Sequence, residues 1–206
     1  MPEENPNLEK LQVATSSRQL EQITSLENIL LRLIKCEHYF DLCSSSKGEF
    51  WHIIQNSLGE SVCLFWCHIF GSYKEDSHYT RFFAKTPHEG FTKNEIKTRL
   101  LKAIKMDEKK YSMFRQEVKH CRDKYIAHKE SEATVIFPYI DKCRVQAEEL
   151  RRVLAEYCEK NSAVEPNSNW PYWAHYYRGN SLKAEHLKAE SERAFSTGIN
   201  LMADGL

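Results

Sequence analysis

Apolar residues recur every three or four positions along most of this chain, which is the pattern of amphipathic α-helices. The first such stretch predicts a helix that starts after Pro6 and Asn7 and runs to about Tyr39. Its expected buried stripe consists of Leu20, Ile23, Leu26, Leu30 and Leu33. The serines before Gly48 break the pattern, so we expect a loop there.

A second helix is predicted from Glu49 to about Phe70, with Gly71 as the residue that stops it. Its apolar positions cover more than one face and are Trp51, Ile54, Leu58, Val62, Phe65, Trp66, Ile69 and Phe70. A helix that is apolar over so much of its circumference is typical of a protein core. We therefore expect it to be the most buried helix of the fold.

Two capping signals follow a polar connection over residues 72–91, which has room for a short helix from about Tyr79 to Ala84. Thr92 and Glu95 have the spacing of a capping box and predict the start of a short helix, whose apolar positions are Ile96, Leu100, Leu101 and Ile104. Asp107 is predicted to cap a longer, charged helix. The narrow apolar stripe of that charged helix is Phe114, Val118, Cys121 and Tyr125.

The last long periodic segment predicts a helix from near Pro138 to about Lys160. Its expected buried seam is Cys143, Ala147, Leu150, Leu154 and Tyr157. Residues 161–169 have the composition of a linker, and an aromatic run over residues 170–177 precedes Arg178 and a helical tail. We expect these aromatic rings to dock on the bundle, with the stacking of nucleic-acid bases as the alternative.

These segments predict an all-α protein, a helical bundle of about five main helices with a C-terminal helical extension. Only 7 Gly and 6 Pro occur in 206 residues, which favours helices over a turn-rich β fold. The predicted division places the bundle at residues 8–160. The linker and the aromatic-rich helical extension, packed on the bundle, occupy residues 161–206.

Composition limits the classes of partner. The 29 basic and 29 acidic residues cancel, so any contact with nucleic acid needs a local basic patch. Seven cysteines without a regular spacing predict free thiols in a reducing compartment. Neither a signal-peptide pattern nor an apolar run of about 20 residues is present, so we expect a cytoplasmic protein without membrane contact.

Cys63 and Cys67 lie one helical turn apart and could share a soft metal ion. Because both flank the apolar face of the predicted core helix, we favour buried core cysteines. The other histidines and cysteines show no ligand spacing, so neither a metal nor a cofactor is predicted.

The strongest candidate for chemistry is the segment Cys121–His128, at the end of the charged helix. Arg122 and His128 suit phosphate chemistry, because a guanidinium can steady a phosphoryl oxygen while an imidazole moves a proton. On one helix the two residues would lie about 120° apart. The structural alternative is an arginine paired with a carboxylate and a histidine that caps the helix. Three lysines make this region basic and would favour phosphate: Lys119, Lys124 and Lys129.

Arg122-Asp123-Lys124-Tyr125-Ile126-Ala127-His128 resembles the signature of the HEPN superfamily, an arginine and a histidine separated by four to six residues. The earlier Trp66–Gly71 segment, the polar loop and the later Arg…Ala-His helix resemble the AbiU-like abortive-infection branch. This resemblance implies a helical bundle that dimerises through the motif helix and is often a metal-independent endoribonuclease of phage-defence or toxin–antitoxin systems. It further implies that His128 transfers protons, that Arg122 stabilises the phosphate and that Asp123 orients one of them.

Two functional hypotheses follow. In the first, the protein is an RNA-cleaving homodimer, with an antitoxin or defence partner that the sequence does not identify. In the second, it is a non-catalytic HEPN-like module that binds a partner protein or a nucleotide. The zero net charge and Asp123, where HEPN members more often carry Asn, favour the second.

Overall fold

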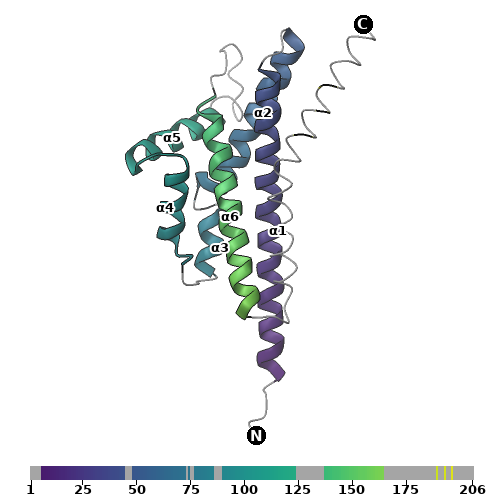
Figure 1. Ribbon diagram of the computed structural model, residues 1–206, viewed down its shortest axis with the longest axis vertical. Coiled ribbons are helices and arrows are strands. Elements are labelled where there is room, and N and C mark those ends of the chain that lie inside the picture. Colours follow the sequence, from purple (N-terminus) through teal and green to yellow (C-terminus); the bar gives the residue numbers. More distant parts are fainter. Residues whose placement is uncertain are drawn as a thin grey trace.

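The computed structural model describes residues 6–44, 48–72, 74, 77–85, 90–123 and 137–164, together with positions 189, 193 and 196. Over the main described segments the chain forms only helices, and the predicted all-α class is confirmed (Figure 1). The elements in chain order are α1 (Pro6–Cys43), α2 (Glu49–Trp66), the π-helix η1 (Cys67–Gly71), α3 (Tyr79–Lys85), α4 (Lys93–Ala103), α5 (Glu108–Cys121) and α6 (Ile140–Val164).

The three longest helices, α1, α2 and α6, pack against one another, and α4 packs on α6. In Figure 1, α6 runs beside α1. Helix α5 contacts α2 and η1. This arrangement brings the end of α5 against the second half of α2, although about 60 residues of chain separate them.

Both predicted capping signals are confirmed. The Thr92 backbone N–H donates to Glu95 Oε2 at 2.9 Å, and the Glu95 N–H donates back to Thr92 Oγ1 at 3.4 Å. The Lys110 N–H donates to Asp107 Oδ1 at 2.7 Å. Because these side chains satisfy N–H groups that have no partner inside a helix, they place the starts of α4 and α5.

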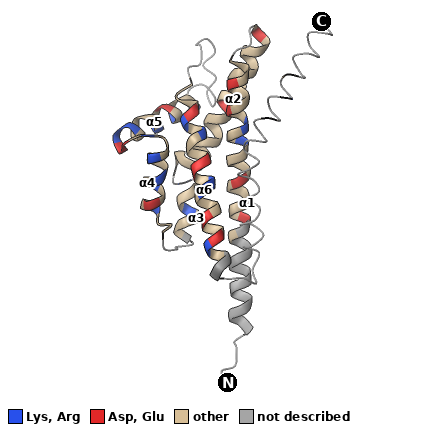
Figure 2. Cartoon of the chain, in the orientation of Figure 1, with Lys and Arg blue, Asp and Glu red and all other residues tan. Residues whose placement is uncertain are grey.

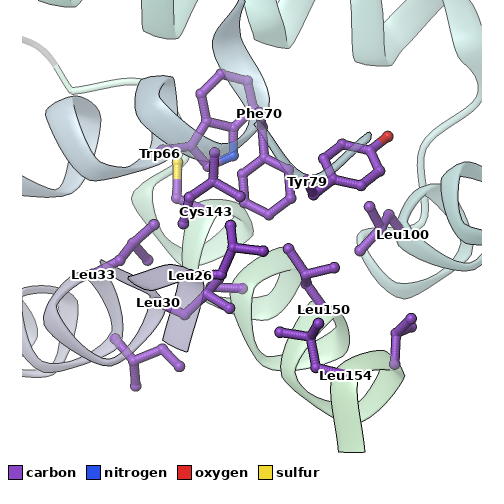
Figure 3. Close-up of a cluster of buried hydrophobic side chains, with 14 of the residues drawn as sticks. Leu26, Leu30, Leu33, Trp66, Phe70, Tyr79, Leu100, Cys143, Leu150 and Leu154 are labelled. Atoms are coloured by element: carbon purple, nitrogen blue, oxygen red, sulfur yellow. The ribbon is translucent and has the colours of Figure 1, made fainter. Parts of the chain in front are cut away.

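The core forms where the apolar stripes of these helices meet (Figure 3). Trp66 is fully buried there and packs edge-on against Phe114 of α5. The indole N–H donates to Gln146 Oε1 at 2.8 Å, and Gln146 Nε2 donates to the Tyr111 hydroxyl at 3.1 Å. These bonds satisfy polar atoms that would be costly to bury alone.

The predicted stripes of α1, α4, α5 and α6 are confirmed where their side chains are described. Buried positions among them are Ile23, Leu26, Leu30, Leu33, Ile96, Leu100, Leu101, Ile104, Phe114, Val118, Cys121, Cys143, Ala147, Leu150, Leu154 and Tyr157.

The ends of two helices differ from the prediction. Helix α1 continues to Cys43, and α6 runs from Ile140 to Val164 rather than from near Pro138 to about Lys160. At the start of α6, Tyr139 has φ 38°, in the left-handed region, so the chain turns there before the helix begins.

The expectation that residues 49–70 form the most buried helix is only half right. Phe50 and Ile53 of α2 are 50% and 57% exposed, whereas Val62, Trp66 and Phe70 are buried. Between the exposed first part and the buried second part of α2 lies Gly59. The Phe137 ring packs closely on this glycine, and a Cβ there would lie only 2.7 Å from the ring. Burial on α2 therefore follows the packing of neighbouring segments rather than its apolar sequence.

None of the helices in the described segments combines the length and apolarity needed to cross a bilayer. The predicted extension over residues 161–206 lies outside the described residues, apart from the last turn of α6 and three single positions. The predicted division into two domains stays a prediction.

Candidate functional site

The candidate site begins where α5 ends. The apolar stripe of Phe114, Val118 and Cys121 fixes this helix against the core, so its last turn is held in place. The α-helical hydrogen-bond pattern stops at Cys121, and Arg122 and Asp123 continue in a wider π-type turn. Such turns are frequent at functional sites because they break the regular helix locally.

Arg122 is held by the residue that follows it. Its Nε lies 2.7 Å and its Nη2 lies 2.6 Å from Asp123 Oδ1. The two side chains are 25% and 53% exposed, so the pair faces solvent. Asp123 therefore orients the Arg122 guanidinium, and it also matches the structural alternative of an arginine paired with a carboxylate.

The π-helix η1 lies against this turn. The Cys67 thiol of η1 experiences the charges of Arg122, Asp123 and Lys119, although burial is the main reason that its pKa rises to about 11. Arg115 of α5 also reaches the end of η1, where its Nε and Nη2 donate to the Gly71 carbonyl at 3.0 and 2.6 Å. These contacts fix the spacing between the site and the core helix α2.

A pair of buried thiols includes Cys121, the residue directly before Arg122. Cys63 of α2 donates its S–H to Cys121 Sγ, with 3.8 Å between the sulfur atoms. The prediction that Cys63 and Cys67 are buried core cysteines is confirmed. Among the described residues, no group of three or more potential ligand side chains lies close enough to hold a metal ion.

The structure brings together only part of the predicted site. Lys119 lies one turn before Arg122 on α5 and is partly buried, and Asp123 contacts Arg122 directly. His128, Lys124 and Lys129 lie outside the described residues. The convergence of Arg122 with His128 therefore stays a prediction.

Sequence reasoning missed two contacts at this site. The Cys63–Cys121 pair joins residues 58 positions apart, and Arg115 reaches a carbonyl 44 positions away. The apolar pattern of the sequence predicts that both cysteines are buried, but their pairing depends on how α5 packs on α2. Helix α5 carries residues of both signs of charge rather than a uniform run of basic residues (Figure 2).

The all-helical fold agrees with the result of a comparison with protein families. A family model for a HEPN class, HEPN_AbiU2 (AbiU2), matches residues 18–165, which is well over half of the chain and includes the whole Arg122–His128 segment. The chain belongs to the AbiU2 family of HEPN proteins. Searches of curated proteins and of solved structures gave no match.

Proposed function

We propose that this protein is a metal-independent endoribonuclease that cleaves RNA with Arg122 and His128. The observation that carries the proposal is the position of Arg122. It stands at the partly exposed end of a helix anchored in the core, inside the segment that the AbiU2 family model matches. A histidine follows six residues later in the sequence.

The chemistry suits these side chains. The imidazole of His128 transfers a proton, either from the attacking ribose 2′-hydroxyl or to the departing 5′-oxygen. Arg122 stabilises the negative charge that builds on the phosphate oxygens. The products are a 2′,3′-cyclic phosphate and a free 5′-hydroxyl. Asp123 positions Arg122, while Lys119, Lys124 and Lys129 attract the RNA backbone.

The biological setting proposed here is abortive infection in phage defence or a toxin–antitoxin system. The protein acts as a cytoplasmic homodimer in which the motif helices of two chains meet. Each chain then contributes residues to a shared cleft, and RNA is the partner.

The test is cleavage of end-labelled RNA by the purified full chain in EDTA, with analysis of the product ends. Arg122→Ala and His128→Ala are each expected to lower the rate by at least about a hundredfold, because both groups act on the reacting phosphate. Arg152→Ala is the matched control for the arginine, because Arg152 is exposed and lies on α6. His120→Ala tests the choice of histidine, because His120 is an exposed histidine two residues before Arg122.

Circular dichroism must show that all four variants remain helical. Cleavage that persists unchanged in Arg122→Ala or His128→Ala would contradict the proposal. A loss that occurs equally in His120→Ala would show that the wrong histidine has been chosen.

One observation favours a second candidate, a non-catalytic module that binds a partner protein or nucleotide. Asp123 already occupies the guanidinium of Arg122, and a carboxylate at this position repels a phosphate. This candidate predicts that the protein binds its partner while RNA remains intact under every condition. Measured binding without cleavage would therefore favour it over the ribonuclease.

A further inference from the structure

The core contains two thiols in contact, at Cys63 and at Cys121, the residue before Arg122. Cys63 and Cys121 are 0% and 3% exposed, and their sulfur atoms lie 3.8 Å apart with a hydrogen bond between them. A single buried cysteine is an ordinary small apolar residue. Two thiols in contact, on helices that are distant in sequence, can also be oxidised together.

The two sulfur atoms are not equivalent. Because Cys121 accepts the hydrogen bond from Cys63, its pKa is lowered, although burial opposes this effect. The same hydrogen bond and the burial raise the pKa of Cys63. Burial raises the pKa of the other five cysteines, Cys36, Cys43, Cys67, Cys143 and Cys158. Cys121 is therefore the thiol that most readily becomes a nucleophilic thiolate, with a second thiol beside it.

We propose that Cys63 and Cys121 form an oxidation site, which hydrogen peroxide converts into a disulfide between α2 and α5. The bond requires the sulfur atoms to approach from 3.8 Å to about 2.0 Å, through rotation of the two side chains and movement of α5 toward α2. Hydrogen peroxide is small enough to reach a nearly closed site beside the partly exposed Arg122.

The reaction proceeds in two balanced steps. The Cys121 thiolate attacks one oxygen of the peroxide, the O–O bond breaks, and the departing hydroxide takes up a proton to become water. The Cys63 sulfur then attacks the resulting sulfenic acid, the S–O bond breaks, and a second water leaves. Two thiols lose two electrons in total, and one peroxide is reduced to two waters.

The bond would act on the candidate site because Cys121 directly precedes Arg122. Drawing Cys121 toward α2 moves the turn that carries the guanidinium, while Arg115 still ties α5 to the end of η1. A displacement of about 1 Å at a catalytic group costs on the order of a hundredfold in rate. We expect oxidation to lower the rate of RNA cleavage at least about tenfold. This effect on the rate rests on the proposed function, whereas the formation of the disulfide does not depend on it.

The experiment treats the reduced, folded full chain with hydrogen peroxide, blocks the remaining thiols with iodoacetamide and maps the peptides by mass spectrometry without reduction. The expected result is the loss of two thiols and one linked peptide pair containing residues 63 and 121, reversed by dithiothreitol. Cys63→Ser should lose the link and accumulate oxygen adducts on Cys121. Cys43→Ser and Cys158→Ser, buried in α1 and α6, should retain the link.

The proposal is overturned if the native chain forms no link, if the link joins other cysteines such as Cys67 and Cys143, or if it forms only after denaturation. RNA cleavage gives a separate measurement. A mapped Cys63–Cys121 disulfide in a chain that never cleaves RNA would refute the proposed function and leave the oxidation site intact. Equal rates of RNA cleavage by the reduced and the oxidised chain would refute the proposed effect of the disulfide on activity.

Discussion

At the scale of single residues, the main contact of the candidate site is the one between Asp123 and Arg122. Its carboxylate lies within 2.7 Å of two guanidinium nitrogens of Arg122, on a surface where water screens the pair. The same carboxylate fixes the direction of the arginine and repels an approaching phosphate. Replacing only the charge separates these two effects.

Asp123→Asn is expected to raise kcat/KM for RNA cleavage by about two- to fivefold, since removing an exposed charge interaction is worth up to about 1 kcal/mol. The asparagine oxygen can still accept a hydrogen bond from Arg122. The measurement is initial cleavage rate at low salt. Asp141→Asn is the matched control, because Asp141 is a similarly exposed carboxylate that lies beside Lys142. A fall as large as that of Arg122→Ala would instead make Asp123 essential to the reaction.

A second residue-scale feature is the buried ion pair between Glu27 of α1 and Arg151 of α6. Arg151 Nε lies 3.0 Å from both carboxylate oxygens, and Nη2 lies 2.6 Å from Oε1. The side chains are only 2% and 8% exposed. A buried pair of this kind is costly to break from one side because the remaining charge is left without its partner.

Glu27→Ala is expected to lower the free energy of unfolding by about 3–5 kcal/mol, whereas the double variant Glu27→Leu with Arg151→Met should lose much less. Urea denaturation measures both. Arg152→Ala removes a pair with Glu149 from an arginine that is 64% exposed, so its cost should stay below about 1 kcal/mol. Equal losses in the single and double variants would show that packing, not charge, sets the cost.

At the scale of elements, α1 and α6 share a second acidic contact of a different kind. Glu37 is fully buried, and Arg144 Nε lies 2.7 Å from its Oε2. This N–H is poorly aligned, and within the described chain both Glu37 oxygens lack a hydrogen-bond partner. Burial therefore dominates and raises the pKa of Glu37 from 4.5 to about 7. Although burial opposes it, the contact with Glu37 raises the pKa of Arg144.

This shift predicts that the contribution of Glu37 to stability falls as the pH rises from about 4.5 to about 7. In that window the unfolded chain has released the Glu37 proton and the folded chain still holds it, so higher pH favours unfolding by up to about 3 kcal/mol. His78 acts in the opposite sense, because burial lowers its pKa to about 4. The test is therefore the difference between wild type and Glu37→Gln, from urea denaturation at pH 4.5, 6 and 8.

Glu37→Gln should gain stability relative to the wild type as the pH rises, because glutamine does not titrate. Glu21→Gln, an exposed change on the same helix, is expected to show no such trend. A constant difference between wild type and Glu37→Gln across the three pH values would show that the pKa of Glu37 is the same in the folded and the unfolded chain, and would contradict the prediction.

At the scale of the whole molecule, the zero net charge limits how RNA can be attracted. The end of α5 in one chain carries few basic side chains. Basic and acidic residues are mixed over α4, α5 and α6 (Figure 2). A cleft formed by two motif helices would double the number of basic groups without changing the overall balance. This is the physical reason to expect a shared site in a homodimer.

Mixing Arg122→Ala chains with His128→Ala chains tests a site made from both. If Arg122 of one chain acts with His128 of the other, half of the randomly exchanged dimers carry one intact site of two, so about a quarter of wild-type activity should return. Sedimentation measures the dimer in parallel. An inactive mixture that is dimeric and fully exchanged would place both catalytic groups in one chain.

Sequence alone accounted for much of the fold. The period of its apolar residues predicted the buried stripes, and Thr92 and Asp107 marked two helix starts, because these signals act within a few residues. The same reasoning singled out Arg122 and the family resemblance that the AbiU2 match confirmed. It left open whether Asp123 contacts Arg122 or His128, since neighbouring side chains adopt several rotamers, and the structure pairs Asp123 with Arg122.

Only the tertiary structure decided which of several similar apolar residues are buried. It also decided which residues far apart in the sequence contact one another. Phe50 and Val62 are both apolar residues of α2, yet one is half exposed and the other is fully buried, because burial depends on which segments cover each turn. Cys63 and Cys121 became a pair, and Arg115 reached Gly71, through the packing of α5 on α2 and η1. Local patterns determine helices because hydrogen bonds and caps are local, whereas the contacts between helices depend on the whole chain.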